Sequence, residues 1–180
     1  MDFNTFLLIL FAIAIITLCS ITTWWFGGML LPIFGGGAPF VPTRQKIIQT
    51  MFMLADLNAQ DVCTDLGSGD GRLVIGACQH GAKRAMGYEI HPGLVYTARR
   101  MIKNAGLDKR ARIYRKTMWK ADLHDTTVVF IYQLPFVMKR IHKKLVDELP
   151  HGARIVSNAF AIPGWEPARQ DGNVFLYIKP

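Results

Sequence analysis

A glycine-rich loop with two carboxylates occupies residues 65–72 of this 180-residue chain, Asp65-Leu66-Gly67-Ser68-Gly69-Asp70-Gly71-Arg72. The mostly apolar segment 62–64 precedes the loop, and the apolar segment 73–77 follows it. This order predicts a buried strand, a tight turn and the start of a helix, which is where doubly wound α/β domains bind their ligands. The alternative interpretation is an ordinary turn whose acids face solvent.

The charge of the loop separates two classes of nucleotide ligand. A dinucleotide carries a pyrophosphate, which binds bare N–H groups at a helix N-terminus and which Asp70 would repel. S-adenosylmethionine (SAM) carries a sulfonium, an ammonium and one carboxylate, so its net charge is positive. Its ribose still needs an acidic partner, and Glu89 supplies one after the apolar segment 85–88. The glycine spacing, G-x-G-x-G, also differs from the G-x-G-x-x-G of dinucleotide sites, so we expect SAM as the cofactor.

The N-terminal segment is apolar enough to cross a membrane. No charged residue lies between Asp2 and Arg44, and residues 6–26 are apolar or weakly polar throughout, which is long enough for a helix that spans the hydrocarbon core. Trp24-Trp25 would then lie at the membrane interface. The chain start lacks the basic region of a signal peptide, and no clear cleavage site follows. We therefore expect residues 1–27 to form a retained single-pass anchor rather than a signal peptide or a buried core helix.

The remainder of the chain divides into a linker and one domain. The glycine-rich segment 35–39 lies within residues 28–42, which we interpret as a linker and pre-domain loop. Residues 43–180 then form the catalytic domain. Their length suits one domain of ordinary size.

Charge predicts the orientation of that domain. Basic residues are absent before the anchor and appear after it at Arg44 and Lys46, which places the domain on the cytoplasmic side or on the equivalent mitochondrial matrix side. Every charge except that of Asp2 lies in the domain, so it carries +9, one unit more than the +8 of the whole chain. An anionic membrane leaflet would attract it. Nucleic acid is the rival explanation, but the basic residues of segment 136–149 lie mostly off its apolar stripe, as on a solvated helix face. We expect no nucleic-acid partner.

Strand and helix patterns alternate along the domain. A helix capped by Thr43 runs to about Ala55. The expected strands are 61–66, 85–89, 112–115, 127–133, 154–160 and 174–178, and the further helices are 72–80, 92–105 and 136–149. This alternation predicts a mainly parallel sheet with helices on both faces and with ligands at the carboxyl ends of the strands. No clear helix joins the third and fourth strands, and any sixth strand must be compressed into residues 163–173.

Cysteines and histidines predict no further chemistry. The three cysteines fall in the anchor, the first strand and the following helix, at positions 19, 63 and 78, so no disulfide framework is implied. The five histidines lack the spacing that surrounds a metal ion, and we expect no metal site.

Several motifs together carry a resemblance to a known family. They are Phe40-Val41-Pro42, the loop 65–72, Gly87-Tyr88-Glu89, Met118-Trp119-Lys120 and Ala159-Phe160-x-x-Pro163-x-Trp165. From Phe40 onward the chain resembles the class I SAM-dependent methyltransferases, which have a Rossmann-like seven-strand sheet. More narrowly, it resembles the membrane-anchored protein-lysine methyltransferases that modify the c-ring protein of ATP synthase and the adenine nucleotide translocase. The resemblance implies a membrane-protein substrate, and it leaves the oligomeric state open.

The site hypothesis divides the candidate residues between cofactor and substrate. Those assigned to SAM are Asp65, Gly67, Ser68, Gly69, Asp70, Gly71, Glu89 and Thr117. Those assigned to positioning a lysine are Phe40, Pro42, Trp119 and Tyr132, with Trp165 completing an aromatic rim that attracts a cation; core packing is the alternative for each aromatic side chain. Thr117 departs from the family pattern, which has an acid there to accept the adenine amino group, so only a weaker hydrogen bond is expected.

The expected reaction depends on positioning. Methyl transfer from a sulfonium to an amine is an in-line displacement, which needs alignment and a neutral nucleophile, and the proton could pass to Asp70 or to bulk water. Tyr132-Gln133-Leu134-Pro135 replaces the Asn/Asp-Pro-Pro-Tyr motif of enzymes that methylate planar nitrogens, which favours an aliphatic amine. A lipid or small-molecule methyltransferase and a non-catalytic SAM-binding scaffold are the alternatives.

Overall fold

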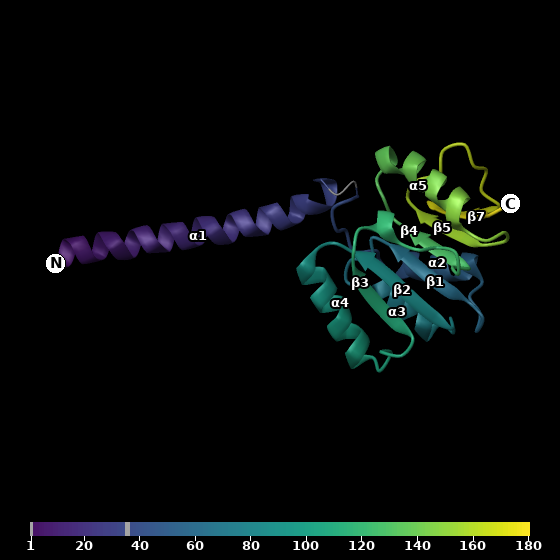
Figure 1. Cartoon of the computed structure of the whole chain (residues 1–180), viewed down its shortest axis with the longest axis horizontal. Coiled ribbons are helices and arrows are strands. Elements are labelled where there is room, and N and C mark those ends of the chain that lie inside the picture. The colour runs from purple at the N-terminus through teal and green to yellow at the C-terminus, as the bar shows by residue number, and fades with distance from the viewer. Residues whose placement is uncertain (1, 35–36) are drawn as a thin grey trace.

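The computed structural model describes residues 2–34 and 37–180, with side chains described for 2–23 and 37–180. A long helix, α1 (Phe3–Phe34), extends away from an α/β domain (Figure 1). Its Phe3–Thr23 part is exposed and is long and apolar enough to cross a membrane, a test that a signal sequence also passes. The helix continues through residues 28–34, which the sequence assigned to the linker. The side chains of Trp24-Trp25 lie outside the described residues, as do Gly35 and Gly36 of the predicted linker.

The domain is built on one seven-stranded sheet in the order β3-β2-β1-β4-β5-β7-β6. The strands are β1 (Val62–Leu66), β2 (Arg84–Glu89), β3 (Ala111–Arg115), β4 (Val128–Ile131), β5 (Arg154–Asn158), β6 (Arg169–Asp171) and β7 (Val174–Ile178). Strands β1 to β5 are parallel, whereas β7 runs antiparallel to β5 and β6 antiparallel to β7. The expected mainly parallel, seven-strand architecture is confirmed. Strand order reverses between β1 and β4, which opens a ligand-binding crevice at their carboxyl ends.

Helices cover both faces of the sheet, as expected. They are α2 (Gln45–Ala55), α3 (Arg72–Gln79), α4 (Pro92–Asn104) and α5 (Pro135–Glu148), and a short 3-10 turn, η1 (Met118–Lys120), joins β3 to β4. Apolar residues of α2, α3 and α4 form one buried cluster with the sheet, and those of α5 form the other. Figure 1 shows α4 and α5 on opposite sides of the strands.

Several element ends differ from the sequence expectation. Helix α2 begins after Arg44, and Thr43 does not cap it: Thr43 is buried and its carbonyl accepts a hydrogen bond from Arg72 instead. Strand β5 ends at Asn158 because Ala159 adopts a left-handed φ of 69°, which breaks the extended backbone. Strand β4 likewise ends at Ile131, so the two residues after it lie in the turn before α5. Within residues 163–173 the structure has the three-residue β6 and no helix.

Gly76 is the point at which α3 packs on α2, and it generates a stability prediction. A Cβ at Gly76 would lie 2.8 Å from Cε2 of Phe52, whose ring is buried. Alanine favours a helix over glycine by about 1 kcal/mol, but overpacking a core costs about 1–3 kcal/mol. We expect Gly76→Ala to lower the free energy of unfolding by about 1 kcal/mol in urea denaturation, and Phe52→Leu in the same chain to remove most of that loss. A Gly76→Ala protein more stable than the parent would contradict this packing.

Candidate functional site

A cavity of about 990 Å³ opens at the carboxyl ends of β1, β2 and β4. Four segments surround it: the pre-domain residues 38–43, the glycine loop after β1, the turn after β2 and the turn after β4. A smaller pocket of about 40 Å³ lies beside it, against Ile90, Thr117 and Met118. Glu89 and Gly67 line both spaces, so the two pockets form a continuous site across the switch point of the sheet.

Backbone hydrogen bonds hold the glycine loop against β2. The N–H groups of Gly67 and Ser68 both donate to the carbonyl of Tyr88, at 3.0 Å each. Gly67 has a φ of 93°, and a Cβ there would lie 2.3 Å from Nε2 of Gln133. Gly69 has a φ of 53°, and a Cβ there would lie 2.4 Å from the ring of Phe40. Both positions therefore require glycine, for backbone conformation and for the close approach of a neighbour.

The carboxylate of Glu89 fastens this loop to the turn after β2. Its Oε2 accepts a hydrogen bond from Gly69 N at 2.9 Å, and its Oε1 accepts from Ile90 N at 2.8 Å and from His91 N at 2.7 Å. The side chain is 8% exposed. Three N–H donors stabilise the ionised form, so Glu89 is both a site wall and the bond that fixes its shape.

Asp65 is the uncompensated acid of the site. It is 4% exposed and lines the cavity, and no side-chain hydrogen bond joins it to the described part of the chain. Burial, together with the nearby Glu89 and Asp70, raises the pKa of the Asp65 carboxyl to about 8. A cation placed beside Asp65 would reverse this shift, so the site favours a positively charged ligand.

Asp70 has a different environment from Asp65, although both belong to the loop. The Arg72 guanidinium binds its carboxylate through Nε at 2.9 Å and through Nη2 at 2.6 Å, and Nη1 of Arg72 donates to the carbonyl of Thr43 at 2.8 Å. These contacts raise the pKa of Arg72. Asp70 and Arg72 therefore tie the pre-domain segment to the loop, and much of the negative charge expected from the sequence is neutralised there.

Gln133 is a site residue that the sequence analysis did not assign. Its Nε2 donates to the carbonyl of Leu66 at 2.9 Å, and its Oε1 accepts from Ala38 N at 2.9 Å. The side chain is buried, and it joins the end of β1 to the pre-domain segment. The signal was a polar residue between the apolar end of β4 and Leu134, but the expected strand over 127–133 concealed it.

The predicted aromatic rim is divided by the structure. Phe40 and Tyr132 line the cavity. Trp119 lies under the Arg140 guanidinium, with Cζ 3.9 Å from a ring centroid, and packs against the core on the α5 face. Trp165 packs against that core too, with its ring centroid 5.7 Å from that of Tyr177. Among the residues described around the two pockets, neither tryptophan appears.

The remaining candidates fall in three places. Thr117 lines the smaller pocket. Pro42 is exposed and lies between two lining residues without lining the cavity itself. The Ser68 hydroxyl is buried and has no hydrogen-bond partner in the described structure, which leaves a polar atom for a ligand. Together with Asp65 and the glycine cradle, this donor set fits the cationic nucleoside cofactor expected from the sequence.

A metal ion is not favoured by the same residues. Over residues 2–34 and 37–180, no group of three or more histidine, cysteine or acidic side chains is arranged to hold one.

Comparison with known proteins agrees with the site. Residues 65–169 match the model of the ANTKMT methyltransferase domain. A protein-lysine N-methyltransferase of Saccharolobus islandicus is 36% identical over 149 residues, which cover 78% of this chain and 92% of that protein. The Mus musculus lysine N-methyltransferase named for the c-ring protein of ATP synthase is 32% identical over 84% of this chain and 68% of its own length.

Two further similarities extend this picture. The adenine nucleotide translocase lysine N-methyltransferase of Mus musculus is 46% identical over 103 residues, and the match spans 57% of this chain and 45% of that protein. A crystal structure of an RNA methyltransferase from Salinibacter ruber, in complex with S-adenosyl-L-homocysteine, is 39% identical with a TM-score of 0.75 and covers 78% of this chain and 94% of that chain.

The uncompensated Asp65 predicts an unusual dependence of stability on pH. Its folded-state pKa of about 8 lies above the unfolded value of 3.8, so the folded chain holds a proton that the unfolded chain loses, and stability falls as pH rises from 4 to 8. Asp65→Asn should remove this loss and raise the free energy of unfolding by up to about 1.4 kcal/mol per pH unit across that range.

Asp61 is the matched control, because it is equally buried but bonded to Arg154, Thr127 and Asn58. Asp61→Asn should destabilise the protein, by about 2 kcal/mol or more. Urea denaturation from pH 4 to 9 compares the two variants, and a destabilised Asp65→Asn at pH 8 would contradict the assignment.

Proposed function

The chain belongs to the ANTKMT methyltransferase domain family, and on that premise we propose that this SAM-dependent methyltransferase methylates a lysine side chain of a membrane protein. The observation that carries the proposal is the uncompensated Asp65 carboxyl, which lies beside the glycine loop in a cavity that opens past Phe40 and Tyr132. Relatives named as protein-lysine N-methyltransferases support lysine as the acceptor.

The chain's own residues divide the cofactor into three parts. When bound, SAM supplies an activated methyl group on a sulfonium. We assign Asp65 and the glycine loop to its cationic amino-acid end, and Glu89, between the two pockets, to its ribose. The smaller pocket at Ile90 and Thr117 is assigned to adenine, where the threonine hydroxyl and the backbone replace the acid of related enzymes. That pocket must widen to admit a purine, since its volume is about 40 Å³.

Phe40 and Tyr132 are the residues we assign to the acceptor. Both line the cavity and present aromatic surface beside the glycine loop, which attracts a lysine ammonium as it arrives and excludes water as it reacts. Asp70 holds Arg72 bidentately, so we assign it to loop structure and leave the amine proton to bulk water at the open mouth. Trp119 and Trp165 are assigned to packing instead.

A membrane setting is the second part of the proposal. We propose that α1 is a retained single-pass anchor within residues 1–27, that residues 28–42 connect it, and that the catalytic domain, residues 43–180, faces the cytoplasm or the mitochondrial matrix. Support comes from the apolar Phe3–Thr23 segment and from the basic residues that begin at Arg44. Relatives named for the c-ring protein of ATP synthase and for the adenine nucleotide translocase support a membrane-protein substrate.

RNA methylation is the alternative favoured by a specific observation. The Salinibacter ruber structure named as an RNA methyltransferase is 39% identical, and basic side chains lie exposed along the edge strand β3, at Arg112, Arg115 and the following Lys116. An electrostatic RNA-binding surface would use such residues.

One labelling experiment separates the acceptor classes. Full-length protein in vesicles is incubated with methyl-labelled SAM and membranes from cells that lack the gene. We expect the label to survive RNase and solvent extraction, to disappear with protease, and to map by mass spectrometry to methyl-lysine. Loss of the label to RNase would establish RNA as the acceptor, and loss to organic solvent would establish a lipid.

The raised pKa of Asp65 predicts how cofactor binding depends on pH. Below about pH 8 the free enzyme carries a proton on Asp65, and that proton must leave when a cation binds. We expect the Kd for SAM to fall by up to about tenfold per pH unit between pH 6 and 8 and to level off above. Titration calorimetry in two buffers of different ionisation enthalpy should detect about one released proton.

Asp65→Asn should abolish this pH dependence and weaken binding at pH 8 by at least about tenfold. Asp125→Asn is the control, because Asp125 is exposed and precedes β4 at the opposite edge of the sheet; its Kd should match the parent. Binding without S-adenosylhomocysteine release from any membrane extract would favour a non-catalytic scaffold.

A further inference from the structure

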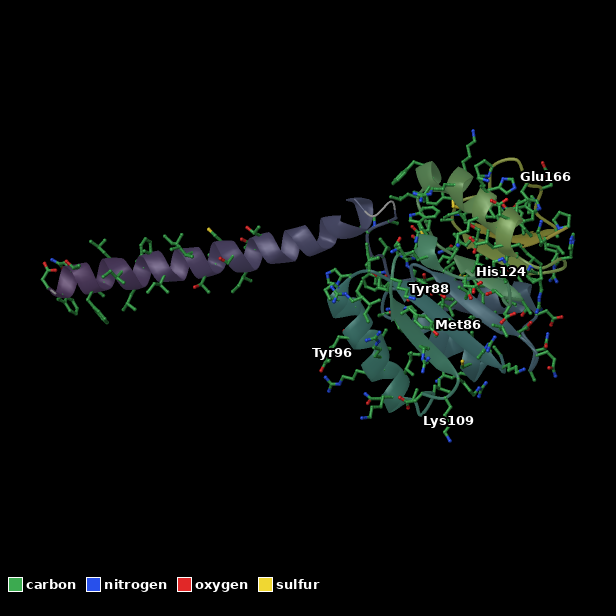
Figure 2. The ribbon with its side chains drawn as sticks, in the orientation of Figure 1. Met86, Tyr88, Tyr96, Lys109, His124 and Glu166 are labelled. Carbon is green, nitrogen blue, oxygen red and sulfur yellow. The ribbon has the colours of Figure 1, made fainter. Side chains whose placement is uncertain are left out.

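Exposed apolar side chains gather at the mouth of the cavity. Phe40 and Val41 line it and are 41% and 55% exposed. Tyr96, in the first turns of α4, is 69% exposed, and Phe136, at the start of α5, is 64% exposed. Figure 2 shows Tyr96 pointing outward from α4, on the side of the domain from which α1 departs. We call these four residues the apolar rim. Their exposure in water is unfavourable, which indicates a partner.

The chain reaches this rim from α1 without a polar spacer. From Phe3 to Thr43 the sequence holds no charged residue, and only six residues separate the end of α1 at Phe34 from Phe40. Such a connection spans at most about 21 Å. If α1 lies in a bilayer, the rim is held close to the bilayer surface.

Charge is distributed in the same sense. Exposed basic side chains flank the rim at the starts of α2, α4 and α5, and they are Arg44, Lys46, Arg99, Arg100, Lys139 and Arg140. Exposed acids occupy the opposite edge, in loops that lead into strands, at Asp56, Asp108 and Asp125. An apolar tip with a basic margin is complementary to an anionic bilayer, whose interface accepts aromatic rings and whose headgroups attract lysine and arginine. Nucleic acid would match the basic margin but not the apolar tip.

We propose that the apolar rim inserts into the interface of an anionic lipid bilayer, so that the mouth of the catalytic cavity lies at the membrane surface. This inference rests on the membrane anchor of the proposed function, but it does not depend on lysine as the acceptor. The anchor provides attachment, whereas the rim fixes the orientation of the domain and the height of its mouth.

Cysteine labelling of the full chain tests the rim with an internal reference. Cys19 in α1 is exposed, whereas Cys63 and Cys78 are buried, so an NBD fluorophore labels the parent in the anchor. The test protein carries Cys19→Ala with Phe136→Cys. The matched control carries Cys19→Ala with Met53→Cys, since Met53 on α2 is 65% exposed, almost equal to Phe136. Each labelled protein is reconstituted into vesicles that contain phosphatidylserine.

We expect doxyl-lipid quenching of the probes at positions 19 and 136 to exceed that at position 53 by at least about twofold, and aqueous iodide to quench position 53 most. A Tyr96→Cys protein should behave like Phe136→Cys. If positions 136 and 96 match position 53 while position 19 is quenched, the rim proposal is wrong and the anchor stands. If position 19 also escapes lipid quenching, both are wrong. A probe at position 136 that responds only to added RNA, or only to a membrane protein, would replace the lipid with that partner.

Discussion

The site depends on one carboxylate, that of Glu89, which accepts three backbone N–H groups from two loops. Gly69 belongs to the loop after β1, and Ile90 and His91 belong to the turn after β2. Because adjacent parallel strands end at the same edge, this side chain can span both loops, and its ionised form is held by donors that cannot move independently. The separation of the two pockets and the path of the glycine loop both follow from these bonds.

The charges of the site fall into two classes. Glu89 and Asp70 are satisfied by fixed donors and determine the shape of the loop, whereas Asp65 is buried without such a donor. An unsatisfied acid destabilises the free protein, but it creates an affinity for a cation that a satisfied acid cannot offer. A cofactor with a positive net charge uses this difference, and the same residue therefore links cofactor affinity, stability and pH.

The sequence predicted what depends on local pattern. Apolar periodicity and glycine positions located the strands, the helices and the loop 65–72, since those signals lie within short windows. It could not locate what depends on contacts between distant segments. The Thr43 carbonyl is taken by Arg72, so the predicted cap is absent; Gln133 became a site residue through bonds to Leu66 and Ala38. Trp119 was assigned to the rim because its chemistry suits a cation, although the cation beside it is Arg140.

The pre-domain segment is fastened at both of its ends, by the bond from Ala38 to Gln133 and by that from Arg72 to Thr43. A load applied from the N-terminal side therefore acts first on Gln133, which is supported by β1, and next on Arg72. The glycine loop carries little of it. Drag on a helix that diffuses laterally in a viscous bilayer is in this way diverted into the sheet, and the reaction centre is mechanically insulated from the motion of its own tether.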